Sequence, residues 1–263
     1  MRILAIASNT FRENIRDKIL YNLIVFALVM ILSSIALGQL TLGHEDKVIV
    51  DIGLSSISIV GTLIAIFIGI GLVFKELEKR TIYALIAKPI HRHEFILGKF
   101  LGLLFTLFVN VAIMTVGLCL TLLWHGGIPA RDYLRLLPAV YMILLALALT
   151  TALALLFSTF STPALSALFT FFLWVIGHFN GDLLEFGRLT KSAQFQWICR
   201  LLYHVLPNFG NFSVAGSQNV IQRAAYYQPL DPAAVFWVSV YAVIYCGVLL
   251  LLSIAVFSRR DFK

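Results

Sequence analysis

Long apolar segments alternate with short polar connections along the whole chain. Six of them contain no Asp, Glu, Lys or Arg, and they are Ile19–Leu37, Ile52–Phe74, Phe100–Trp124, Leu136–Phe157, Thr159–Phe179 and Ala233–Phe257. A helix needs roughly 20 apolar residues to cross the hydrocarbon core of a bilayer, and each segment approaches or exceeds that length. The pattern therefore predicts an all-α polytopic integral membrane protein with six transmembrane helices.

Composition agrees with this fold class. The 263 residues are 60% hydrophobic and only 13% charged, whereas a soluble domain has roughly 25% charged residues. The apolar segments leave little room for a soluble domain beside them. We therefore expect residues 1–263 to form a single transmembrane domain.

Basic residues are distributed unevenly between the two sides of the predicted bundle. Of the 20 Lys and Arg residues, 13 fall in the N-terminal segment, the connection after the second span and the C-terminal tail. Lys and Arg are enriched in the cytoplasmic connections of membrane proteins, so this distribution predicts cytoplasmic N- and C-termini. The same rule explains the net charge of +7, which in a soluble protein would suggest nucleic acid. We expect no nucleic-acid partner.

The N-terminal segment, residues 1–18, has an amphipathic pattern. Its apolar residues recur at helical spacing, at Ile3, Leu4, Ala7, Phe11 and Ile15. This spacing predicts an elbow helix that lies on the cytoplasmic membrane face. The alternative is a basic flank that only orients the first span.

The outer connection, residues 180–232, contains a second amphipathic segment. One apolar face is formed by Phe195, Ile198, Leu201, Leu202 and Val205. We expect interfacial helices here that contact the outer-leaflet lipids, either as a gate or as packing.

The connection between the second and third spans mixes charges of both signs. Residues 75–99 read KELEKRTIYALIAKPIHRHEFILGK. A short cytoplasmic helix is expected first; Pro89 ends it, and Glu94 begins the helix that enters the third span. On charge alone this stretch could do no more than anchor two spans.

The order of residues in this stretch resembles the cytoplasmic connection of ABC-2 type exporter permeases. Their pattern of E-x-E-x-G-T, a leucine-rich turn, P-x-x-R and G-K is matched by Glu76, Glu78, Thr81, Leu85, Pro89, Arg92, Gly98 and Lys99. Arg80 stands where that family usually has glycine. The ending FSRRDFK is also similar to this family, and LPNFGNFSV resembles its branch of permeases that serve nitrous-oxide-reductase maturation.

The resemblance implies that residues 75–99 form a coupling loop that docks on a separate ABC ATPase. The implied coupling residues are Glu76, Glu78, Thr81, Leu85, Ile86, Pro89 and Arg92, with Leu85 and Ile86 as apolar contacts. It further implies a permease in a prokaryotic cytoplasmic (inner) membrane. Its partners would be membrane lipids, two ATPase copies that bind ATP and Mg, and a second permease, identical or related.

The chain itself has no recognisable catalytic or metal motif. Gly98–Lys99 cannot belong to a phosphate-binding loop, because His93 stands where that loop needs its first glycine. HExxH and GxSxG are absent as well. We therefore expect no enzyme activity, no cofactor and no metal in this chain. The charge-free spans also disfavour an ion-coupled transporter. The alternative function is a membrane scaffold, or a membrane enzyme with its site in residues 180–232.

Two further sets of residues are candidates for helix packing or a transport path. Gly61, Ala65 and Gly69 place small side chains on one face of the second span, as in close helix contacts within a chain or between two copies. Thr106 and Asn110 share a face of the third span, where they could line a path or form an interhelical hydrogen bond.

Overall fold

The computed structural model describes residues 2–39, 45–78, 91–126, 128–181, 187, 189, 193–215, 218–228 and 230–259. Its helices are α1 (Arg2–Ile15), α2 (Lys18–Gly38), α3 (Glu45–Glu78), α5 (Arg92–Trp124), α6 (Ala130–Ser158), α7 (Pro163–His178), α9 (Ala193–Val205), α10 (Gly210–Ser213), α11 (Val220–Ala225) and α12 (Pro232–Arg259). The short strands β1 (Val214–Ala215) and β2 (Gln218–Asn219) pair antiparallel.

Each apolar segment of the sequence corresponds to one helix of a membrane-spanning bundle. Among the described residues, five helices are long and apolar enough to cross a bilayer, namely α2, α3, α5, α6 and α12. The remaining segment forms α7, a shorter apolar helix of 16 residues. It begins at Pro163, whose missing N–H costs nothing in a first turn. The predicted all-α polytopic fold is confirmed.

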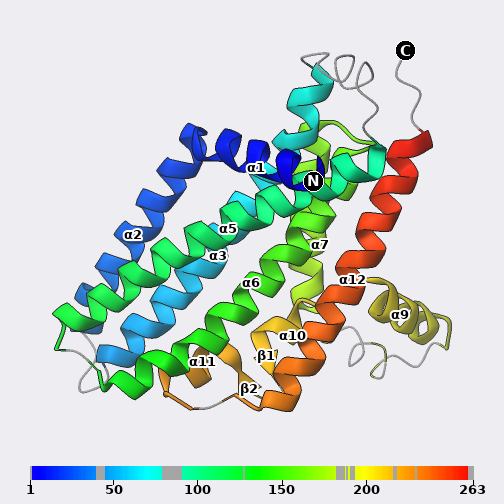
Figure 1. Ribbon diagram of the computed structural model, residues 1–263. Coiled ribbons are helices and arrows are strands. Elements are labelled where there is room, and N and C mark those ends of the chain that lie inside the picture. Colours follow the sequence, from blue (N-terminus) through cyan, green and yellow to red (C-terminus); the bar gives the residue numbers. More distant parts are fainter. Residues whose placement is uncertain are drawn as a thin grey trace.

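Helices α3 and α6 form the centre of the bundle (Figure 1), and they are the most buried of the five long spans. They pack on each other through the small residues of α3. A side chain added at Gly61 would lie 2.8 Å from Leu147 of α6, and one added at Gly69 would lie 3.1 Å from Ala154 of the same helix. Ala65, between these glycines, is fully buried. This face of α3 therefore packs within the chain.

The start of α1 and the end of α12 lie at the same end of the bundle, which we call the termini end (Figure 1). This end also holds the last turns of α3 and α12, the first turn of α5 and the connection from α6 to α7.

Polar contacts join the helices at the opposite end. Glu45, in the first turn of α3, forms an ion pair with His125, which follows α5. The Tyr227 hydroxyl donates to the Asp46 carboxylate at 3.2 Å, and Arg135 of α6 donates to the Tyr227 carbonyl at 2.8 Å. Burial, followed by the negative charge of Asp46, raises the pKa of Tyr227. These contacts join α3 to the end of α5, and they hold α3 and α6 to the segment before α12.

Candidate functional site

The first turn of α5 lies at the termini end and is tied to the last turn of α12. The Arg92 guanidinium donates from one nitrogen to the carbonyl oxygens of Phe257 at 2.8 Å and Ser258 at 2.5 Å. The ring of Phe95 stacks on that of Phe257 with centroids 5.7 Å apart. The last carbonyls of a helix have no partner within the helix and carry partial negative charge, so a guanidinium is well suited to cap them.

One turn further along, α5 contacts α1 at backbone distance. A side chain added at Gly98 would lie 2.6 Å from Ile6, and one at Gly102 would lie 2.6 Å from Thr10 and 2.7 Å from the Ala7 carbonyl oxygen. Only glycine at both positions allows this approach. Helix α1 therefore crosses directly over α5, as Figure 1 shows.

The glycine face of α5 continues into a polar contact at Thr106. The Asn14 side-chain amide donates to the Thr106 hydroxyl at 3.1 Å, and Thr106 donates to the Gly102 carbonyl at 2.9 Å. The Asn110 amide donates to the Thr106 carbonyl in its own helix at 2.8 Å. Thr106 and Asn110 are both buried. In this structure Thr106 joins two helices, and a path along these residues stays a prediction.

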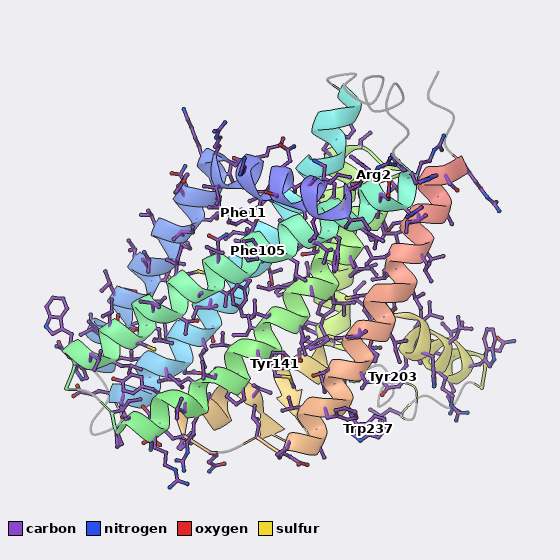
Figure 2. The ribbon with its side chains drawn as sticks, in the orientation of Figure 1. Arg2, Phe11, Phe105, Tyr141, Tyr203 and Trp237 are labelled. Carbon is purple, nitrogen blue, oxygen red and sulfur yellow. The ribbon has the colours of Figure 1, made fainter. Side chains whose placement is uncertain are left out.

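Ion pairs and aromatic rings add to the α1–α5 contact. The Lys99 side chain is only 1% exposed, and its ammonium lies 3.6 Å from the Glu13 carboxylate of α1. Arg2 and Glu94 form a more exposed pair at 4.0 Å. Phe11 and Phe105 meet edge to face with centroids 4.6 Å apart (Figure 2). Arg2 lies in the first turn of α1, whereas Phe11 and Glu13 lie near its end, so these contacts fix α1 at both ends.

Together these contacts define the site, which we call the α1–α5–α12 junction. It links three helices at the end of the molecule where α3 ends and α5 begins. Within the described ranges, no three His, Cys, Asp or Glu side chains are arranged to hold a metal ion. The contacts of the junction hold α1, α5 and α12 together.

The predicted coupling residues are placed unevenly by the structure. Glu76 and Glu78 belong to the last turns of α3. Arg92 is the first residue of α5 and contacts α12. Thr81, Leu85, Ile86 and Pro89 lie outside the described residues. Contact of this set with an ATPase stays a prediction.

Comparison with known families agrees with the sequence pattern. A family model described as ABC-2 family transporter protein matches residues 4–262, which is nearly the whole chain. The chain belongs to the ABC-2 transporter family. No match is found among the curated proteins.

Membership in the ABC-2 family gives the junction a context. The chain is the membrane-spanning permease of an ABC transporter and a multi-pass membrane protein. ABC-2 permeases work with ABC ATPase partners, and the family implies a transport subunit rather than a catalytic one. Residues 79–90 are the centre of the predicted coupling loop of this ABC-2 permease. Arg92, at the start of the junction helix α5, follows them closely in the sequence.

Several junction residues were not identified from the sequence. The predicted elbow face includes Leu4, which is 71% exposed, whereas the polar residues Thr10 and Asn14 are buried. The sequence did contain a signal, because Gly98, Gly102 and Thr106 recur every four residues. Such a stripe of small residues marks a helix-packing face. It does not reveal that the partner is α1, nor that polar side chains fill the contact.

Proposed function

We propose that this permease exports its substrate across a prokaryotic cytoplasmic membrane, driven by ATP that a separate ATPase chain hydrolyses. Both termini and residues 75–99 would face the cytoplasm. The observation that supports coupling is the position of the junction. The chain leaves α3 at Glu78 and re-enters α5 at Arg92, and that same first turn of α5 holds the end of α12.

In this proposal the junction transmits a displacement of residues 79–90 by the ATPase to α5, α1 and α12. An ATPase that displaces residues 79–90 would move the start of α5. Helix α1 would follow, because its backbone touches Gly98 and Gly102. Helix α12 would follow through Arg92. Packed helices that are linked in this way move as a rigid body rather than deforming one by one.

We further propose that two permease copies work with two ATPase copies. With six helices, one copy would supply half of a translocation path, and the second copy would be identical or related. Native mass spectrometry of the purified ATPase-bound complex tests this. A mass that corresponds to a single permease chain would contradict it.

The coupling proposal is tested with the complex of permease and ABC ATPase in nanodiscs. The double variant Leu85→Asp, Glu78→Lys should abolish ATPase binding. Gly102→Val should leave binding intact but lower the stimulation of ATP hydrolysis several-fold, because the added methyl groups separate α1 from α5. Gly247→Val is the matched control, since a side chain there meets open space.

Two outcomes would contradict the proposal. One is an ATPase that still binds and is still stimulated by the double variant. The other is unchanged stimulation by Gly102→Val in a complex whose thermal stability has fallen, because the junction would then serve stability alone. Gly102→Ala, the smaller change, should lie between wild type and Gly102→Val.

A further inference from the structure

Helix α9 lies at the side of the bundle, next to α12, and is joined to it at its C-terminal end (Figure 1). The Tyr245 hydroxyl of α12 donates to the Val205 carbonyl at the end of α9, at 2.6 Å. The backbone N–H of Asn208 donates to the Tyr241 hydroxyl at 2.8 Å. Tyr245 is the central residue of the apolar segment Ala233–Phe257. The C-terminal end of α9 therefore lies within the depth of the membrane-spanning helices.

Contacts with the C-terminal end of α7 also place the end of α9 within the depth of the membrane-spanning helices. The Gly177 carbonyl accepts a hydrogen bond from the Phe209 N–H at 2.9 Å. The Asn180 side chain donates to the carbonyls of Tyr203 at 3.3 Å and Leu206 at 3.4 Å. Because α7 has only 16 residues, about 24 Å of helix, these contacts are made before a full crossing of the hydrocarbon core is complete.

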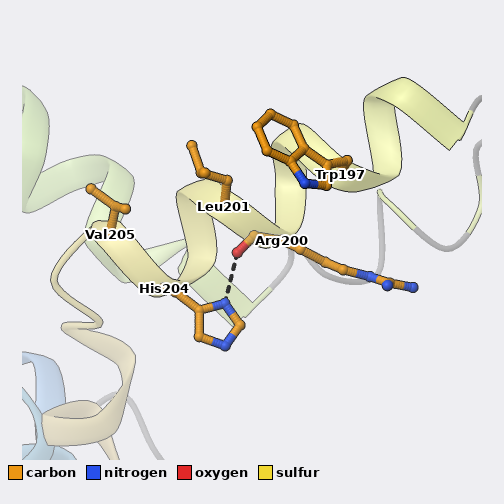
Figure 3. A pocket seen from close by; sticks show the side chains of 5 residues that line it. All are labelled: Trp197, Arg200, Leu201, His204 and Val205. Atoms are coloured by element: carbon orange, nitrogen blue, oxygen red, sulfur yellow. Dashed lines mark hydrogen bonds between the residues drawn. The ribbon is translucent and has the colours of Figure 1, made fainter.

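Only a narrow side of α9, around Cys199, is covered, and the rest of the helix is open. Cys199 is buried, whereas Trp197 is 65% and Val205 63% exposed. Trp197, Arg200, Leu201, His204 and Val205 line a shallow groove of about 360 Å³ along this open side. Figure 3 shows the Arg200 side chain extending away from the helix, and the His204 ring bonded to the Arg200 carbonyl at 2.8 Å.

The groove combines an apolar lining with a positive charge. No acidic residue occurs in α9, and Arg200 forms no ion pair within the part of the chain that the structure describes. A guanidinium below the headgroup level is costly unless an anion meets it. A free phosphate ion would have to enter an apolar environment to do so, whereas a phospholipid brings its phosphate together with acyl chains that fit the apolar lining.

We propose that this groove binds an anionic phospholipid from the leaflet opposite the termini end. Arg200 takes the phosphate in a two-pronged hydrogen-bonded contact. An acyl chain lies along Trp197, Leu201 and Val205. The Arg200 side chain extends toward the headgroups, and the bilayer thins locally around it.

Lipid retention in native mass spectrometry tests the proposal. The full permease is equilibrated with phosphatidylglycerol or with phosphatidylcholine. Wild type should retain phosphatidylglycerol preferentially, and Arg200→Gln should lower its apparent affinity about tenfold. Arg200→Lys, which keeps the charge, should retain most of it. Arg131→Gln is the matched control, because Arg131 is an exposed basic residue outside α9, in the first turn of α6.

A second measurement asks what covers the groove. Brominated phosphatidylglycerol should quench the fluorescence of Trp197, obtained as the difference between wild type and Trp197→Phe. Equal retention by wild type and Arg200→Gln would overturn the proposal. So would an unquenched Trp197, which would indicate that a second copy of the chain covers this face. A third outcome would overturn the choice of a lipid. In it, inorganic phosphate displaces the bound phosphatidylglycerol, and retention of the lipid does not depend on the length of its acyl chains.

Discussion

The most unusual residue of the junction is Lys99. It directly precedes the charge-free segment Phe100–Trp124, and its side chain is 1% exposed. Its ammonium lies 3.6 Å from the Glu13 carboxylate and 5.8 Å from the centre of the Phe95 ring. Desolvation of an ammonium is offset only by good partners. Glu13 is 36% exposed at its side chain, so water still reaches the pair and screens it. We therefore expect a modest but specific interaction.

A double-mutant cycle measures that interaction. Glu13→Gln, Lys99→Met and the double variant should give a coupling free energy of about 1–2 kcal/mol, because one partner is buried and the other is not. In the pair of Arg2 and Glu94, the Arg2 side chain is 57% exposed. The same cycle for this pair should give a coupling free energy of less than about 1 kcal/mol. Unfolding in mixed micelles, followed by circular dichroism, provides these values. Equal coupling for both pairs would show that the burial of Lys99 adds nothing.

At the residue scale, sequence reasoning succeeded where one physical effect dominates. An unpaired charge in the hydrocarbon core is costly, so the lack of charged residues in a long apolar segment is a reliable signal of a membrane span. The predicted spans were identified in this way. Lys99 was matched only to a family pattern, because its burial depends on where α1 crosses α5. Arg92 was expected to contact an ATPase, yet its guanidinium also caps α12, more than 160 positions later in the chain. Contacts across such separations leave no local pattern.

At the element scale, the capping of α12 by Arg92 predicts a local change in stability. Arg92→Gln removes the charged donor to the Phe257 and Ser258 carbonyls. The last turn of α12 should then open more often, with amide exchange about tenfold faster, since a charged hydrogen bond contributes about 1.5 kcal/mol. Hydrogen–deuterium exchange of the full permease measures this. The first turns of α12 should be unchanged, and acceleration along the whole helix would contradict the local cap.

The contact of Tyr227 with Asp46 predicts a response to alkaline pH. Burial and the Asp46 charge raise the pKa of Tyr227 above its ordinary value of 10.0. The unfolded chain therefore loses this proton first, so the stability that the neutral hydroxyl contributes is present below pH 10 and falls as the pH rises further. The melting temperature should decline more steeply above pH 10 in wild type than in Tyr227→Phe. Parallel curves would contradict the assignment.

Helix positions were more predictable than helix environments. The apolar segment Phe100–Trp124 gave the position of α5, although the helix begins eight residues earlier, at Arg92. Its charged first turns are stable because α1 and α12 cover them. The sequence placed α9 in an outer connection through its amphipathic face, but periodicity cannot show depth. Depth follows from Tyr245 and Asn180, whose hydrogen bonds join segments that are far apart in the chain.

At the scale of the whole molecule, charge and architecture lead to the same orientation. The three segments that hold 13 of the 20 Lys and Arg residues are the N-terminal segment, the connection after α3 and the C-terminal tail. The described parts of all three meet at the termini end (Figure 1). Basic flanks are retained on the cytoplasmic side during insertion, so we expect the termini end to face the cytoplasm.

Labelling of single cysteines tests this orientation. The native cysteines, Cys119, Cys199 and Cys246, are all free and are first replaced by serine. In that background, Arg131→Cys should react with a membrane-impermeant maleimide in intact cells, whereas Arg12→Cys should react only after permeabilisation. Both positions are exposed and lie at opposite ends of the bundle, so access to each depends on the membrane alone. Labelling of Arg12→Cys but not Arg131→Cys in intact cells would invert the topology. It would also place the α1–α5–α12 junction out of reach of any cytoplasmic ATPase.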